Sequence, residues 1–213
     1  MTAQPDPQEE IGYAADRFKA FADAVVAIAL TLLILPLMES VGEVASAGDG
    51  AFDWLAQHRG QLLSFVLSFV LIAMFWMIHH RLFARVERVT PALMWLLSAW
   101  LLTIVWLPVA TAVAGRMDDD DAVAKALYIG SLALTALMSL VVRLYLRGHP
   151  ALHRVSSAEL QTGVAVDVSL VLLFGVALGL ALLFPVIGYF ALLVMGLSGV
   201  VQSALEKAIR RNP

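Results

Sequence analysis

The chain has 213 residues, of which 61% are hydrophobic and 15% are charged, and its formal net charge is −3. These values are far from those of a soluble globular protein, and the slightly acidic balance argues against a nucleic-acid partner. The chain has no cysteine, which excludes disulfides, thiolate metal sites and a thiol nucleophile.

The first 16 residues are polar and acidic and contain two prolines, so we expect them to form a disordered segment. They lack the basic start of a cleavable signal peptide. From residue 17 on, the apolar residues gather into six runs, each close to the ~20 residues that a membrane-spanning helix needs. The predicted helices span residues 18–38, 60–80, 91–113, 122–145, 158–183 and 186–206. Residues 17–213 are therefore predicted to form one all-α membrane domain with six transmembrane helices.

Basic residues predict how the helices are oriented in the membrane. In the six-helix arrangement, eleven of the 14 Lys and Arg residues fall on one side, and Arg59, Arg116 and Lys125 fall on the other. We therefore expect both termini in the cytoplasm. Acidic residues gather on the outer side, where they either raise the local cation concentration or simply keep the helix ends in water.

The first predicted helix carries a stripe of four residues within a ~60° arc of the helical wheel: Ala24, Ile28, Thr31 and Leu35. Such a stripe suits a helix packed around a central axis. Apolar residues at this spacing are also typical of ordinary helix packing, and Thr hydroxyls in membrane helices often bond the carbonyl four residues back. The residues alone leave both interpretations open.

Two carboxylates fall inside predicted membrane helices, where ionisable groups are rare and usually functional. Asp23 lies one to two turns inside the first helix. Lys19 precedes it by four residues, so a plain intrahelical ion pair is an alternative to a functional role. Asp167 lies about ten residues into the fifth helix, where it either bonds Gln161 or a nearby hydroxyl, or faces a water-filled crevice.

The second predicted helix follows a connection with a short surface helix expected around residues 52–55, and it ends in Trp76, His79, His80 and Arg81. Adjacent residues on a helix point ~100° apart, so one histidine is expected to face the bundle and the other the headgroups. We expect Trp76 and one histidine to contact Asp23, the alternative being an interfacial belt of aromatic and basic residues. Adjacent histidines lack the i, i+4 spacing with which a helix binds one metal, so we predict no metal site.

Further along the chain, Pro108 is expected to kink the third helix or to end it near the outer surface. Gly175 and Gly179 form a small-xxx-small pair that permits close packing of the fifth helix. Residues 186–190 share only a Gly and a Tyr with the filter of ordinary potassium channels, so we interpret them as a hairpin turn.

Three motifs resemble those of the transmembrane protein 175 family of potassium channels. The signature of that family's first helix is matched by Arg17, Phe21, Asp23, Ile28, Thr31 and Leu35. The ends of the second and third helices resemble the family at residues 76–83 and 107–111. Ala22 departs from the family's Ser. The last three helices match the family only in number and hydropathy.

This resemblance implies a homotetrameric, moderately selective potassium channel with no carbonyl filter, lined by the first helix of each copy. It assigns a hydrophobic gate to Ile28, with Ala24 and Leu35 also lining the pore, and it assigns selectivity to Thr31. A network at the cytoplasmic end is expected to anchor the pore helix and comprises Arg17, Phe21, Asp23, Trp76, His79 and His80. The expected setting is a prokaryotic plasma membrane, with lipid and potassium or other monovalent cations as partners and no cofactor.

The main alternative is a proton-coupled or ion-coupled secondary transporter with Asp23, a histidine and Asp167 as a relay. Carriers more often show inverted repeats and helices broken at mid-membrane, whereas Pro36 and Pro108 fall near predicted helix ends. A membrane enzyme needs catalytic groups clustered at one depth, and no nucleophile stands beside Asp23 and the histidines, so no catalytic residue is predicted.

Overall fold

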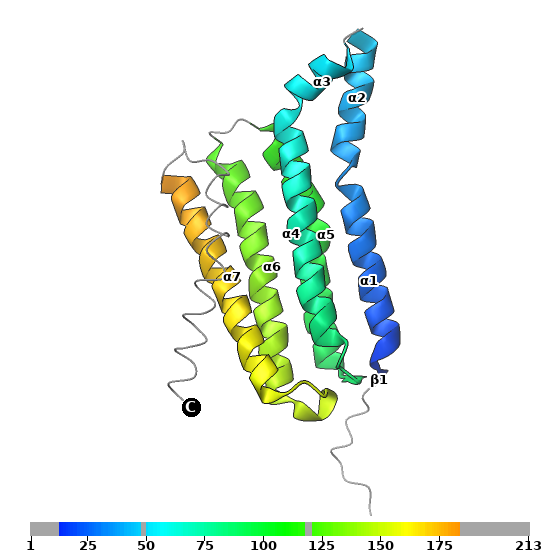
Figure 1. Cartoon of the computed structure of the whole chain (residues 1–213), viewed down its shortest axis with the longest axis vertical. Helices are drawn as coiled ribbons and strands as arrows, with labels where there is room; N and C mark the ends of the chain where they lie inside the picture. Colours follow the sequence, from blue (N-terminus) through cyan, green and yellow to red (C-terminus); the bar gives the residue numbers. More distant parts are fainter. Residues whose placement is uncertain (1–12, 48–49, 118–120, 184–213) are drawn as a thin grey trace, which may run out of the picture.

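The computed structural model describes residues 13–47, 50–117 and 121–183 of the chain. Five helical spans in these ranges are long and apolar enough to cross a membrane. They lie side by side in a bundle, and successive spans run in opposite directions (Figure 1). The predicted helix at 186–206 and the predicted hairpin turn at 186–190 lie outside the described residues.

The spans are α1 with α2 (Ala15–Leu32 and Leu35–Ala47), α4 (Arg59–Phe83), α5 (Pro91–Arg116), α6 (Ala122–Gly148) and α7 (Ser157–Leu183). The short elements are β1 (Tyr13–Ala14), α3 (Ala51–Gln57), β2 (Arg88–Val89) and the 3₁₀ helix η1 (Pro150–Leu152). Five of the six predicted membrane helices are therefore present, and α3 confirms the predicted surface helix. We call the end of the bundle that carries β1 and β2 the sheet end, and the other the α3 end.

Local sequence explains where two of the long helices begin. The Thr90 hydroxyl accepts a hydrogen bond from the Leu93 amide at 3.2 Å, and Pro91 occupies the first turn of α5. The Asp121 carboxylate accepts from the Val123 and Ala124 amides at 2.8 and 3.0 Å at the start of α6. These caps satisfy amides that have no partner within the helix.

The first span is broken, whereas the sequence predicted one helix over 18–38. α1 ends at Leu32 and α2 begins at Leu35. Pro36 has no N–H to bond the Leu32 carbonyl, and its ring clashes with that carbonyl, so the α-helical ladder cannot continue. The break falls inside the apolar span Ala15–Val41 and not near its end, which corrects the position expected for Pro36. Pro108, by contrast, lies within α5, which continues to Arg116.

Residues 13–16 are ordered by pairing, which corrects the prediction that they belong to a disordered segment. β1 pairs with β2 in antiparallel register, with Tyr13 opposite Val89 and Ala14 opposite Arg88. The Ala15 amide donates to the Glu87 carbonyl at 3.2 Å, and α1 begins at this residue. The start of α1 is therefore held by the connection between α4 and α5.

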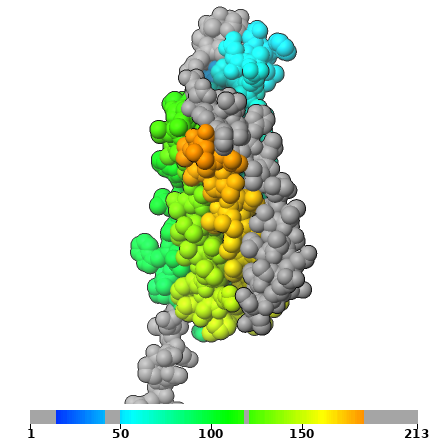
Figure 2. Space-filling view, turned by 90° about the vertical axis from the view of Figure 1, so that its left-hand side faces the viewer, coloured from blue at the N-terminus to red at the C-terminus, as the bar shows by residue number. Residues whose placement is uncertain are grey.

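The core lies among α5, α6 and α7, while α1 packs on α5 and α4 at the edge of the bundle (Figure 1). Large side chains fill the core, among them Trp100, Tyr128 and Phe174, each at most 1% exposed. Figure 2 views the bundle from the side of α7, where α6 and α7 lie next to each other, away from α1. Within the described residues, the first span thus lies at one edge of the bundle.

Candidate functional site

One face of α1 is packed against the bundle and the opposite face is open. The packed face has the small or branched side chains Ala22, Val26 and Ala29, and Leu33 at the break is packed in the same way, each at most 4% exposed. Small residues let membrane helices approach closely. The open stripe consists of Ala24, Ile28 and Thr31 on α1 and of Leu35, the first residue of α2 beyond the break, and all four are exposed. Ile28 is 59% exposed and Leu35 is 49% exposed, so this face is available to lipid or to other copies of the chain.

The Thr31 hydroxyl donates to the Ile28 carbonyl at 2.7 Å, three residues back and not four. That bond uses the only proton of the hydroxyl. A hydroxyl oxygen has two acceptor lone pairs, so Thr31 retains acceptor capacity while its donor is engaged. In this geometry the exposed oxygen can act as a ligand to a cation.

Asp23 connects α1 to α4 beside the open stripe. The Trp76 indole N–H donates to Asp23 Oδ1 at 2.8 Å, and His80 Nδ1 lies 3.7 Å from the same oxygen. The Trp76 and His80 rings lie 5.2 Å apart between centroids. Lys19 bonds Asp16 at 3.1 Å, so the alternative of a Lys19–Asp23 pair is not what the structure has.

The other residues of the predicted network lie apart from Asp23. The His79 ring is buried and stacks between Phe83 and Trp100, with centroid separations of 4.3 and 4.1 Å. Arg17 and Phe21 are exposed. The structure thus gathers Asp23, Trp76 and His80 and places His79 in the core, where the two adjacent histidines point in different directions.

Asp167 lies in a buried ion pair with Arg143, a partner that the sequence did not predict. Arg143 Nε donates to Asp167 Oδ2 at 2.5 Å, and the two side chains are 8% and 0% exposed. A Cβ atom at Gly163, one turn before Asp167 on α7, would lie 2.1 Å from the Arg143 guanidinium. The glycine therefore leaves the space through which Arg143 reaches the carboxylate. The pair joins α6 to α7 and replaces the expected bond to Gln161 or a water-filled crevice.

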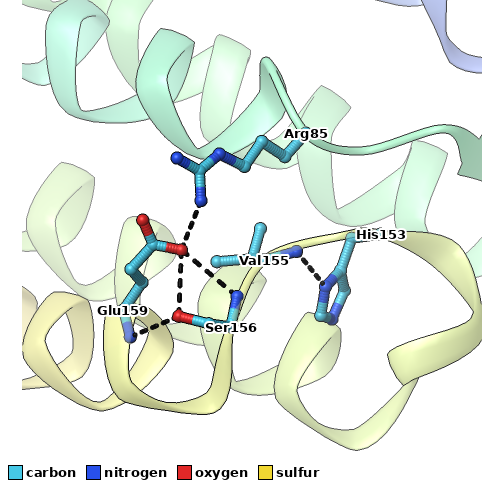
Figure 3. Close-up of polar contacts among 5 residues, drawn as sticks. All are labelled: Arg85, His153, Val155, Ser156 and Glu159. Carbon is cyan, nitrogen blue, oxygen red and sulfur yellow. Dashed lines mark hydrogen bonds and ion pairs between the residues drawn. The ribbon is translucent and has the colours of Figure 1, made fainter.

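The connections at the sheet end are tied to one another by polar contacts (Figure 3). Arg85, from the α4–α5 connection, forms an ion pair with Glu159 of α7. The Glu159 carboxylate also accepts from the Ser156 amide at 3.2 Å, while the Ser156 hydroxyl accepts from the Glu159 amide at 3.3 Å. This reciprocal pairing is a capping box at the start of α7. Val86 bridges to His153, so the α4–α5 connection also pairs with the α6–α7 connection.

A family model matches the part of the chain that contains the open stripe and the Asp23 contacts. Residues 17–108 match the family model described as endosomal/lysosomal potassium channel TMEM175. A potassium channel of Streptomyces collinus is 36% identical over 124 residues, which are 57% of this chain and 58% of that protein. The endosomal/lysosomal proton channel TMEM175 of Gallus gallus is 32% identical over 112 residues, which are 50% of this chain and 22% of that protein. The matched region therefore spans less than two thirds of either relative.

A solved structure has a similar fold. It is the crystal structure of a lysosomal potassium-selective channel TMEM175 homologue from Chamaesiphon minutus. The TM-score is 0.59 with 24% sequence identity, and the superposition covers 93% of this chain and 98% of the other. At this identity the likeness establishes the fold alone. With the five apolar spans, it makes this chain a multi-pass membrane protein.

Proposed function

Residues 17–108 match the TMEM175 family model, and from that match we propose that the protein is a potassium channel of this family whose pore is lined by α1. The observation that carries the proposal is the division of α1 into a packed face and an open stripe. An anchor helix at the edge of a bundle needs no polar group in its exposed face, yet this stripe carries the Thr31 hydroxyl between Ile28 and Leu35.

We propose that the channel is a homotetramer. One chain presents one open stripe and cannot enclose a pore, whereas a closed ring of identical copies brings the stripes to a common axis. Four copies then form stacked rings of Ile28, Thr31 and Leu35. The rings at 28 and 31 are about 4.5 Å apart along a helix that rises 1.5 Å per residue.

The rings have different proposed roles. Four Ile28 side chains form a hydrophobic constriction, which closes a pore when water leaves it. Four Thr31 oxygens offer acceptors to a partly dehydrated cation. Hydroxyl oxygens from a single ring replace only part of a hydration shell, so we expect moderate selectivity for potassium. Asp23 lies 100° around the helix from Ala24, off the stripe, and its proposed role is to fix α1 to α4 and not to bind ions.

A second candidate is a proton channel, because the matching protein of Gallus gallus is named one. A secondary transporter with Asp167 in a relay is less well supported, since both oxygens of that carboxylate face the Arg143 guanidinium at 2.5 and 3.4 Å. The proposed location is a plasma membrane, with lipid around the outer faces of the tetramer.

The test is potassium flux into liposomes that hold the purified protein, compared with an Ile28→Asn variant. Asn in the constriction keeps water in the pore, so we expect potassium-driven flux to rise by about tenfold or more. Leu134→Asn is the matched control, because Leu134 is an exposed apolar residue of α6, at 49%, away from α1. An equal rise in both variants would indicate a general leak, and no potassium flux in any folded form would refute the channel. Flux that needs a proton gradient alone would favour the second candidate.

A further inference from the structure

A small cavity lies beside the break in the first span, between that span, α4 and α5. Its lining includes Leu33, Pro36, Gln61, Thr111, Gly115 and Arg116. The cavity measures about 10 Å³, which is close to the smallest volume that holds one water molecule. Organic ligands are therefore too large for it.

One polar atom at this cavity lacks a partner. Gln61 Oε1 is buried and has no hydrogen bond among the residues that the structure describes. An unpartnered buried oxygen is costly, and such atoms are usually satisfied by ordered water when no protein group reaches them. Gln61 is in the first turn of α4, and it faces the break from the other side of the cavity.

The break also interrupts the backbone hydrogen bonds of the first span. Pro36 cannot donate to the Leu32 carbonyl, and the Leu37 amide donates to the Ile34 carbonyl at 3.1 Å instead of continuing the α-helical ladder. Kinked membrane helices are tolerated because neighbouring side chains and ordered waters satisfy the backbone groups that the kink frees.

A chain of hydroxyls reaches the same cavity from the core. The Tyr128 and Ser68 oxygens lie 2.9 Å apart, and the Thr111 hydroxyl lies 2.8 Å from Ser68 Oγ. Thr111 also lines the cavity. Polar side chains of α4 and α5 therefore line the cavity, and Ser68 links Thr111 to Tyr128 of α6.

We propose that a single ordered water binds in this cavity and donates hydrogen bonds to Gln61 Oε1 and to a backbone carbonyl that Pro36 frees. A metal cation does not suit the site, because the guanidinium of Arg116 lines it and would repel positive charge. Arg116 Nη2 donates to Glu39 Oε2 at 2.6 Å and to the Pro36 carbonyl at 3.5 Å, and no donor of the described residues bonds Gln61 Oε1. The water joins α4 to the break and makes the break a defined joint between α1 and α2.

The direct test is a crystal or electron-microscopy structure at a resolution that shows ordered water. We expect density within hydrogen-bond distance of Gln61 Oε1 in the native protein, with no such density in Gln61→Leu. A dry cavity, a Gln61 side chain turned onto a protein group, or density with the several short oxygen contacts of a metal ion would overturn the proposal.

A double-mutant cycle tests the link to the break. Gln61→Leu should lower the Tm of the purified protein by about 3 °C. Gln57→Leu on α3, where Gln57 is exposed, is the matched control and should leave Tm unchanged. In a Pro36→Ala background, the new backbone N–H at position 36 can bond the Leu32 carbonyl, so Gln61→Leu should cost less than half as much. Strictly additive losses would contradict a water shared by Gln61 and the break.

Discussion

The two intramembrane carboxylates hold their helices in different ways. Asp167 is fully buried and paired with the Arg143 guanidinium, and it fastens α7 to α6 within the core. Asp23 has 42% of its side chain exposed, accepts from a neutral indole and lies near His80, at the edge of the bundle. A buried ion pair thus joins α6 to α7, whereas the first span is attached to the bundle by small side chains and a few polar contacts. A helix at the edge of the bundle can present its open face to other copies, which the proposed pore requires.

We expect the largest loss of stability when the buried Arg143–Asp167 ion pair is broken. Asp167→Ala leaves the Arg143 charge buried without its partner, and removal of one partner from such a pair costs about 3–5 kcal/mol. We expect loss of most folded protein, measured as the fraction of monodisperse protein after purification in detergent. Native-like yield and Tm would contradict a structural role for the pair.

A double replacement separates structure from ion transport. Arg143→Met with Asp167→Leu removes both charges and keeps apolar packing, which is often neutral for stability. We expect this variant to fold and to retain potassium flux. A folded variant that has lost flux would place Asp167 on the transport path and revive the transporter interpretation.

An intermediate effect is expected at Asp23. Asp23→Leu removes the acceptor of the Trp76 indole, and for a half-exposed hydrogen bond the loss is about 1 kcal/mol. Asp23→Asn keeps an acceptor oxygen and should lose less. Thermal unfolding of the two variants checks the order, and the fraction of tetramer on a sizing column checks assembly. If both variants assemble normally but change ion selectivity, Asp23 lies on the ion path and our comparison of the two carboxylates is wrong.

We expect the smallest change in stability and flux from a substitution at the sheet end. Glu159→Gln keeps the shape of the capping box and removes only the charge that faces Arg85. Exposed ion pairs contribute little, so we expect an unchanged Tm and unchanged flux in liposomes. A large change in flux with unchanged Tm would show that the connections at this end control the pore.

The sequence predicted the elements well where the signal is local. Apolar runs of about 20 residues identified the five described spans, because the hydrocarbon thickness fixes their length. The ~100° angle between neighbours separated the directions of His79 and His80, but it did not decide which of them lies beside Asp23, because that depends on how α4 is rotated against α1.

Long-range pairs were not predictable from spacing. Arg143 and Asp167 are 24 residues apart on different helices, and Arg143 resembled one more basic residue of the cytoplasmic side. β1 was missed for a similar reason, since its partner β2 is about 75 residues further along the chain and a two-residue strand has no periodicity to detect. The break at Pro36 was misplaced because an apolar run gives the length of a span and not the point at which its backbone ladder is interrupted.

The central claim is that the open stripe of α1 lines the pore, and the absence of native cysteine allows a direct measurement. Single cysteines at Ala24, Ile28, Thr31 and Leu35, and at the packed positions Val26 and Ala29, are treated with a charged, water-soluble thiol reagent during potassium flux. We predict that the reagent changes flux at the four stripe positions and leaves the two packed positions unaffected, with the periodicity of a helix. Equal reactivity around α1, or no effect at the stripe in a conducting protein, would contradict a pore lined by this helix.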